Sequence, residues 1–138
     1  MDDIEAIRRL KARYFRTMDT KDWAGMRVVF TDDVVIDTSE AGGERIEGVD
    51  TFMVFLPGAL SGATTVHQGH MPEIDLTSDT TATGIWALND IVIWEGGMRL
   101  DGYGHYHETY RKLDGEWRIA SSKLTRLHVD FTVPEENG

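Results

Sequence analysis

Apolar residues at helical spacing open the chain. They recur every three or four positions, at Ile4, Ile7, Leu10, Tyr14 and Met18. This spacing places them on one face of an α-helix. Acidic side chains near the start of the segment and arginines near its end suit the helix dipole. The pattern therefore predicts an amphipathic helix from about Asp2 to Met18.

Shorter patterns predict the remaining elements of the first half. Helices are expected from Asp22 to Phe30 and from Val49 to Leu60, where a Pro-Gly pair lies near the end of the second one. The apolar run from Val34 to Asp37 predicts a first strand between them. The polar, glycine-containing residues 39–48 are expected to form a loop.

The second half of the chain is rich in β-branched and aromatic residues. Four runs predict long strands, over residues 64–76, 80–94, 102–113 and 116–131. The Asp114-Gly115 pair between the last two runs is typical of a tight hairpin turn, which makes those strands antiparallel.

Helices followed by an antiparallel sheet predict an α+β fold, in which the helices cover one face of a curved sheet. We expect one domain over residues 1–131 and a flexible C-terminal tail over residues 132–138.

Composition excludes several classes of function. The 138 residues include 24 acidic and 14 basic side chains, which gives a net charge of −10 with neutral histidine. This charge argues against nucleic-acid or membrane partners. The absence of cysteine excludes a disulfide framework and a thiolate metal site. Because no signal peptide or membrane-spanning segment is evident, we expect a cytoplasmic protein.

Histidines are the first candidates for proton-transfer chemistry. All five lie in predicted strands, at His67, His70, His105, His107 and His128. No carboxylate stands at a recognisable ligand spacing from them, so we expect no metal site. His67 differs from the others because it follows a small, apolar stretch in which its ring would be sequestered and would need a partner. A hydrogen-bonded core histidine is the alternative interpretation.

Two residues of the first helix are candidate partners for this histidine. Asp19 lies where the helix ends, so its side chain can turn into the fold or out to water. A turn or capping aspartate is the alternative interpretation. Tyr14 lies on the apolar stripe, which carries its hydroxyl group into the interior, where a tyrosine usually finds a hydrogen-bond partner.

Three segments carry a resemblance to a known family. IRRLKARYFRTMDTKDW, FTDDVVID and GHYHETYRKLDGEWRIASSKLTRLHVD are similar to sequences of SnoaL-like proteins in the nuclear transport factor 2-like superfamily. The resemblance implies a cone-shaped α+β fold, with three N-terminal helices on the concave side of a strongly bent, mainly antiparallel sheet. The superfamily includes dehydratases, dehydrochlorinases, isomerases, cyclases and non-enzymatic binders.

Some lyases of this superfamily, among them the bile-acid 7α-dehydratases, have an aspartate at the end of the first helix and a histidine on the strand after the third helix. Asp19 and His67 match these positions, and the resemblance implies that they form a catalytic dyad. Tyr14 matches a tyrosine of the bile-acid dehydratases and is implied as a third catalytic residue. The dehydrochlorinases have a lysine there instead, which disfavours their particular chemistry.

The resemblance also implies substrate-binding residues. Asp90 matches a pocket aspartate, and Arg126 and Lys123 are alternative candidates for a basic residue on the last strand. We expect the other lining residues to be apolar or aromatic, at Trp23, Ile36, Phe52, Phe55, Trp86, Leu88 and Tyr106. The chain has no glycine-rich phosphate loop or dinucleotide fingerprint, so we expect no cofactor.

These features predict a cofactor-independent lyase that eliminates water from a bulky hydrophobic molecule, such as a steroid, a polyketide or an aromatic catabolite. His67 would take the acidic proton, and Asp19 would hold its imidazole ring. The alternatives are an enzyme resembling ketosteroid isomerase or a polyketide cyclase, and a non-catalytic ligand-binding domain. We also expect a homodimer or homotrimer.

Overall fold

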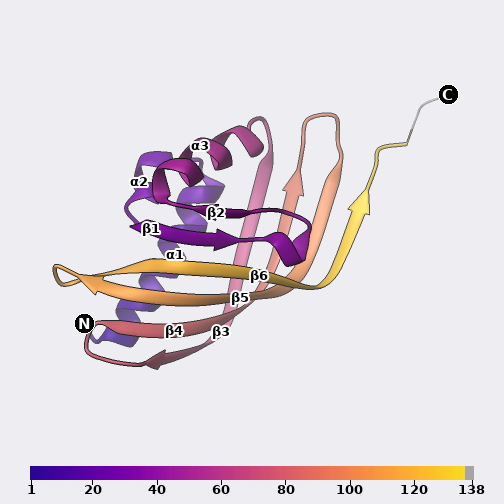
Figure 1. The fold of residues 1–138 in the computed structure, drawn as a ribbon. Helices are drawn as coiled ribbons and strands as arrows, with labels where there is room; N and C mark the ends of the chain where they lie inside the picture. Colours follow the sequence, from indigo (N-terminus) through magenta and orange to yellow (C-terminus); the bar gives the residue numbers. More distant parts are fainter. Residues whose placement is uncertain (136–138) are drawn as a thin grey trace.

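Three helices lie over the concave side of one curved sheet in the computed structural model, which describes residues 1–135 (Figure 1). The helices are α1 (Asp3–Asp19), α2 (Trp23–Arg27) and α3 (Val49–Ala59). A short 3-10 helix, η1 (Ser39–Ala41), follows the first strand. The predicted α+β architecture with three N-terminal helices is confirmed.

The sheet has six strands in the order β2-β1-β6-β5-β4-β3. The strands are β1 (Phe30–Asp37), β2 (Arg45–Glu47), β3 (Thr64–Leu76), β4 (Thr81–Ile93), β5 (Arg99–Leu113) and β6 (Glu116–Thr132). All neighbours are antiparallel except β1 and β6, which are parallel. Register shifts interrupt the β3–β4 and β5–β6 ladders. Such bulges increase the local twist and bend of a sheet, which suits the curvature around the helices.

Two predicted boundaries in the first half were wrong. The second helix ends at Arg27, and Phe30 already belongs to β1. The strand begins early because the backbone of Val29 accepts a hydrogen bond from Ile119 of β6, a contact that a local pattern does not show. The expected loop over residues 39–48 contains β2, whose central Ile46 is buried. Three residues are too few to display an alternating pattern.

The C-terminal boundary also differs slightly from the prediction. Strand β6 includes Thr132, the first residue of the expected tail. Residues 133–135 have no regular secondary structure, and residues 136–138 of that tail lie outside the described part of the chain. Within residues 1–135, no helix is long and apolar enough to cross a membrane.

Alternating burial along β4 carries the interior face of the sheet toward the site. The buried positions are every second residue, at Ala82, Gly84, Trp86, Leu88, Asp90 and Val92. This is the period of two that places alternate side chains on the same face of a strand. A carboxylate, Asp90, is thereby held on the same inward face as the apolar core, directly opposite His67 in the β3–β4 ladder.

Candidate active site

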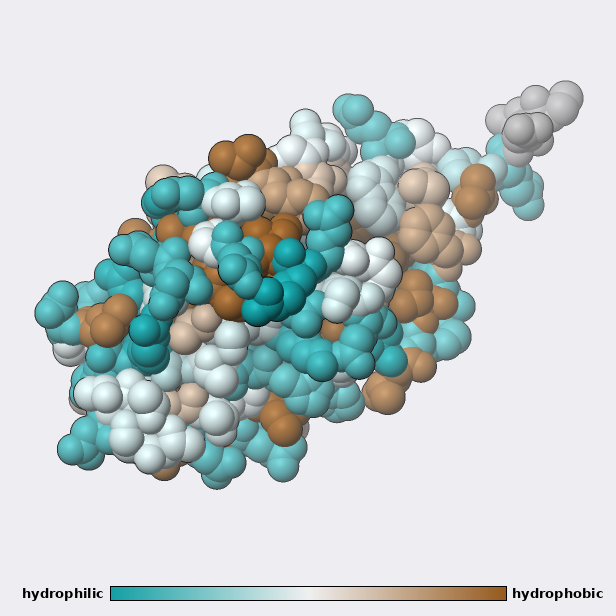
Figure 2. Space-filling view, in the orientation of Figure 1, coloured by the Kyte–Doolittle hydropathy of each residue, from teal (hydrophilic) through white to brown (hydrophobic). Residues whose placement is uncertain are grey.

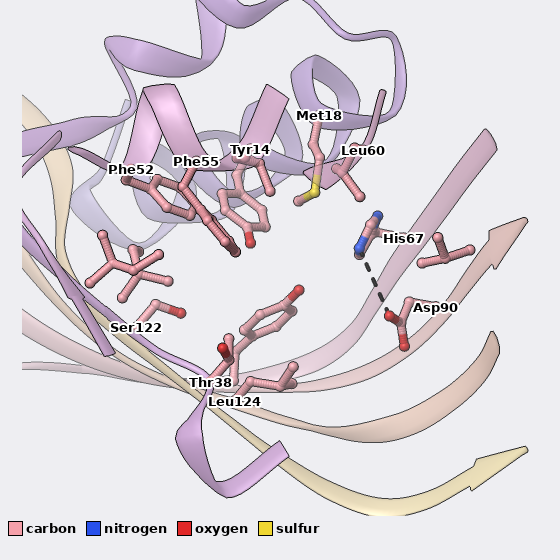
Figure 3. A pocket seen from close by; sticks show the side chains of 15 residues that line it. Tyr14, Met18, Thr38, Phe52, Phe55, Leu60, His67, Asp90, Ser122 and Leu124 are labelled. Atoms are coloured by element: carbon pink, nitrogen blue, oxygen red, sulfur yellow. Dashed lines mark ion pairs between the residues drawn. The ribbon is translucent and has the colours of Figure 1, made fainter. Parts of the chain in front are cut away.

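An apolar cavity of about 150 Å³ lies between the helices and the concave side of the sheet. In Figure 3, Tyr14, Phe52 and Phe55 point into it from the helices, His67 and Asp90 lie at one side, and Ser122 lies at the other. Figure 2 shows hydrophobic residues gathered over α3 and between α3 and β2, bordered by hydrophilic side chains. Phe55 of α3 lines the cavity and remains 45% exposed, so it connects the cavity with this surface.

Asp19 and His67 form the predicted hydrogen-bonded pair beside the cavity. The Nδ1 atom of His67 lies 2.7 Å from Oδ1 of Asp19, and the backbone N–H of His67 donates to Oδ2 at 2.8 Å. The hydroxyl of Thr65 donates to Oδ1 at 2.9 Å. A carboxylate accepts hydrogen bonds, so it selects the tautomer in which Nδ1 carries the proton. The other ring nitrogen, Nε2, is left free to accept a proton.

The fold fixes this geometry from two elements. Asp19 is the last residue of α1, and His67 lies near the start of β3, 48 residues later. The ring of Phe15 lies nearly parallel to the imidazole, with 6.3 Å between their centres. The His67 side chain is 8% exposed, so its ring has little freedom to turn. It nevertheless lines the cavity, which is the arrangement expected of a base rather than of a sealed core histidine.

A second carboxylate faces the other nitrogen of the imidazole. Oδ2 of Asp90 lies 3.9 Å from Nε2 of His67, a pair that Figure 3 marks with a dashed line. Arg126 binds both oxygens of Asp90, at 2.6 and 3.0 Å. Bidentate pairing of this kind fixes the orientation of the carboxylate. A negative charge at this distance stabilises the imidazolium that forms when Nε2 takes a proton.

Gly102 makes the Asp90–Arg126 pair possible. A Cβ atom at this position would overlap with the guanidinium of Arg126 and with Oδ1 of Asp90. Sequence analysis did not single out this glycine, since its role depends on three strands coming together in the fold. Of the two basic candidates on β6, Arg126 is therefore the one that reaches the site through Asp90. Lys123 is half-exposed and pairs with Glu40.

Two tyrosines supply hydroxyl groups to the cavity. Tyr14 and Tyr106 both line it, and their rings meet edge to face with 5.8 Å between centres. Burial raises the pKa of Tyr14 and the pKa of Tyr106 above the usual value for a phenol. Both groups therefore stay protonated at neutral pH and are available as hydrogen-bond donors.

The structure brings together most of the predicted site residues. Ile36, Phe52, Phe55, Asp90 and Tyr106 line the same cavity as Tyr14 and His67. Several lining residues were not singled out from the sequence: Met18, Thr38, Ile46, Leu56, Leu60, Val92, Ser122 and Leu124. Most of them are apolar residues, which a local sequence pattern assigns to the hydrophobic core. Only the three-dimensional structure shows which apolar residues line the cavity and which are packed in the core.

Three aromatic or apolar residues that were expected in the lining lie elsewhere. Trp86 is buried next to Phe15 of α1, and its indole N–H donates to the hydroxyl of Tyr110 at 2.9 Å. Leu88 fills the hydrophobic core, and Trp23 packs against its edge. Alternate residues of β4 point inward along its whole length, but only Asp90 and Val92, near its end, line the cavity. Within residues 1–135, no cluster of three or more metal-ligating side chains is present.

A curated relative and two solved structures are similar to this chain over most of their lengths. A Gibberella zeae protein named "Probable cyclase FGR4" is 24% identical, with 88% of this chain and 89% of the relative aligned. "Putative Scytalone Dehydratase" from Novosphingobium aromaticivorans DSM 12444 has a TM-score of 0.86 at 21% identity, covering 96% of this chain and 89% of that one. A hexachlorocyclohexane dehydrochlorinase (LinA) of type 2 has a TM-score of 0.84 at 16% identity, covering 97% and 91%.

The structural matches establish the nuclear transport factor 2-like fold, and at these identities they establish the fold alone. The sequence profile of the SnoaL-like domain family matches residues 1–123. That match takes in the three helices, the Asp19–His67 pair and every cavity-lining residue except Leu124. The chain belongs to the SnoaL-like domain family.

Proposed function

We propose that this protein is a cofactor-independent lyase that eliminates water from a cyclic β-hydroxy carbonyl compound, with His67 as the base. One observation carries the proposal: the imidazole is held by Asp19 through Nδ1, while the same side chain lines an apolar cavity. A paired but sealed histidine would favour a structural role. The names of a dehydratase and a dehydrochlorinase among proteins of the same fold agree with elimination chemistry.

The reaction begins when Nε2 of His67 takes a proton from the carbon next to the carbonyl group. The carbonyl oxygen gains negative charge, and the hydroxyl groups of Tyr14 and Tyr106 can donate hydrogen bonds to it. Asp19 and Asp90 stabilise the imidazolium from its two sides. The carbon–oxygen bond to the leaving hydroxyl then breaks, and the imidazolium gives its proton to that oxygen. Water leaves, a carbon–carbon double bond forms, and His67 regains its starting state.

The size of the cavity narrows the substrate class. An apolar space of about 150 Å³ is enough for one six-membered ring, since an engineered cavity of that volume binds benzene. A substrate with several rings would have to leave its remaining rings outside, along the exposed ring of Phe55. Among the classes expected from the sequence, the cavity favours a small catabolite with a single ring over a steroid or a polyketide with several rings.

An isomerase or a cyclase is the second candidate. Such an enzyme would use the same base and the same hydrogen-bond donors on a different carbonyl compound. The relative named as a cyclase supports this second candidate. Proton removal next to the carbonyl group is common to both candidates. Release of water distinguishes them.

The direct test uses 3-hydroxycyclohexanone, a single-ring β-hydroxy ketone that loses water to give cyclohexenone. The conjugated product is followed by its ultraviolet absorbance. We expect the protein to accelerate its formation above the buffer-catalysed rate. If the protein binds the ketone, exchanges its α-hydrogens with solvent and releases no water, the isomerase or cyclase interpretation is favoured. Binding without either reaction would contradict both.

A further inference from the structure

A buried charge pair lies directly behind the two cavity tyrosines. Lys11 of α1 and Glu108 of β5 are 0% and 3% exposed, and Nζ of Lys11 lies 2.8 Å from Oε2 of Glu108. The ammonium nitrogen lies 3.8 Å from the ring centre of Tyr14 and 3.6 Å from that of Tyr106. One cation therefore contacts the faces of both rings whose hydroxyl groups belong to the cavity.

Hydrogen bonds hold the partner of this cation in place. Glu108 accepts from the hydroxyl of Tyr110 at 2.8 Å and from the hydroxyl of Ser122 at 2.7 Å. Tyr110 in turn accepts from the indole of Trp86. The Glu108 carboxylate is thus satisfied by groups other than the cavity tyrosines, and the ammonium of Lys11 lies between it and their rings. Burial lowers the pKa of Lys11, and Glu108 opposes that shift.

Burying two charges is costly, and a core can usually do without them. An apolar pair of similar volume is often as stable as a buried ion pair. A cation against the face of a phenol ring is attracted to the ring and favours negative charge on the phenol oxygen. This makes the hydroxyl a stronger hydrogen-bond donor. Lys11 is therefore placed to act on the tyrosines without touching a ligand in the cavity.

We propose that Lys11 is a positioning residue whose charge strengthens the Tyr14 and Tyr106 hydroxyl groups as donors to an anionic oxygen in the cavity. The identification of this oxygen as that of a substrate enolate rests on the proposed function. The effect of Lys11 on the two tyrosines does not depend on the proposed function.

The other charged groups around the tyrosines are of the opposite sign or paired. Glu108 and Asp90 raise the pKa of both phenols, and Asp19 raises that of Tyr14. Arg126 is engaged with Asp90. Lys11 is thus the cation in direct contact with the two rings, and its loss should make both phenols less acidic.

The acidity of the tyrosines can be measured without a ligand. The protein is produced with 3,5-difluorotyrosine, which titrates in an accessible pH range, and each fluorine signal is assigned with a Tyr→Phe variant. In Lys11→Met we expect the pKa of the residues at 14 and 106 to rise by about one unit or more. Lys11→Arg keeps a cation against the rings and should leave both values near those of the unsubstituted protein. Tyr103, half-exposed, is the internal control.

A purely structural role predicts a different result. The larger arginine would then disturb the tyrosine signals at least as much as methionine does. That outcome, or unchanged pKa values in Lys11→Met, would overturn the proposal. If Lys11→Met does not fold, Lys11→Gln takes its place, since its amide can still donate a hydrogen bond to Glu108 but carries no charge. The pKa values of the two tyrosines should still rise, and no rise would overturn the proposal. Failure of 3-hydroxycyclohexanone to react would count against the proposed function and would leave this readout unaffected.

Discussion

Replacing His67 with alanine lowers the rate of water elimination from 3-hydroxycyclohexanone by at least about a thousandfold, within the range expected for losing a general base that also returns the proton. The backbone N–H of His67, which donates to Asp19, survives the substitution. The fold should therefore be retained. Turnover is measured by enone absorbance, and folding is checked by circular dichroism and thermal unfolding.

His70 provides a matched control on the same strand. Its ring is exposed and pairs with the side chain of Asn89 instead of lining the cavity. His70→Ala should leave the rate within about twofold of the unsubstituted protein. A His67→Ala protein that keeps more than a tenth of the activity would show that the imidazole is not the base. A large loss of stability with little loss of rate would favour a structural role for the pair.

Replacing Asp19 with asparagine lowers the rate by about a hundredfold to ten-thousandfold, because the side-chain amide can present an N–H group to Nδ1 of His67. The imidazole would then carry its proton on Nε2, the nitrogen that must accept one. The rate constant for elimination is the primary measurement. Nitrogen-15 NMR of the labelled imidazole reports the tautomer directly and should show the proton moving from Nδ1 to Nε2.

Thr65→Val separates this effect from the loss of a hydrogen bond. It removes the hydroxyl that donates to Oδ1 of Asp19 and leaves the carboxylate in place. The variant should lose some stability, about 1 kcal/mol, and less than tenfold in rate. A comparable rate loss in Thr65→Val and Asp19→Asn would contradict the role of the carboxylate in selecting the tautomer.

Long periodic segments were the part of the fold that the sequence predicted well. The apolar stripe beginning at Ile4 predicted α1 to within one residue at each end. The run of β-branched and aromatic residues over 80–94 predicted β4 (Thr81–Ile93) equally closely. The short elements were predicted poorly because tertiary contacts decide them. Strand β2 forms because Ile46 pairs with Ile36 of β1. A three-residue sequence pattern is too short to predict such a contact.

The candidate site divides in the same way. Resemblance to a family pointed to Asp19, His67 and Asp90, and the structure brings them together. Lys11 had a local signal, since it is a charged residue within an apolar helix face. Its partner Glu108 lies 97 residues away, and only the fold could identify it. Trp86 was misplaced because periodicity shows which face of a strand is inward, and not which part of that face a helix covers.

The central claim is that His67 removes a proton from the carbon next to a carbonyl group in the cavity. Hydrogen–deuterium exchange at the α-carbons of cyclohexanone in D₂O tests it most directly, because the exchange needs this step alone and no leaving group. Mass spectrometry follows the deuterium content. We predict exchange faster than in buffer with the unsubstituted protein and with His70→Ala, and a return to the buffer rate with His67→Ala. Exchange that is not accelerated while the ketone is bound, or that persists in His67→Ala, would contradict the claim.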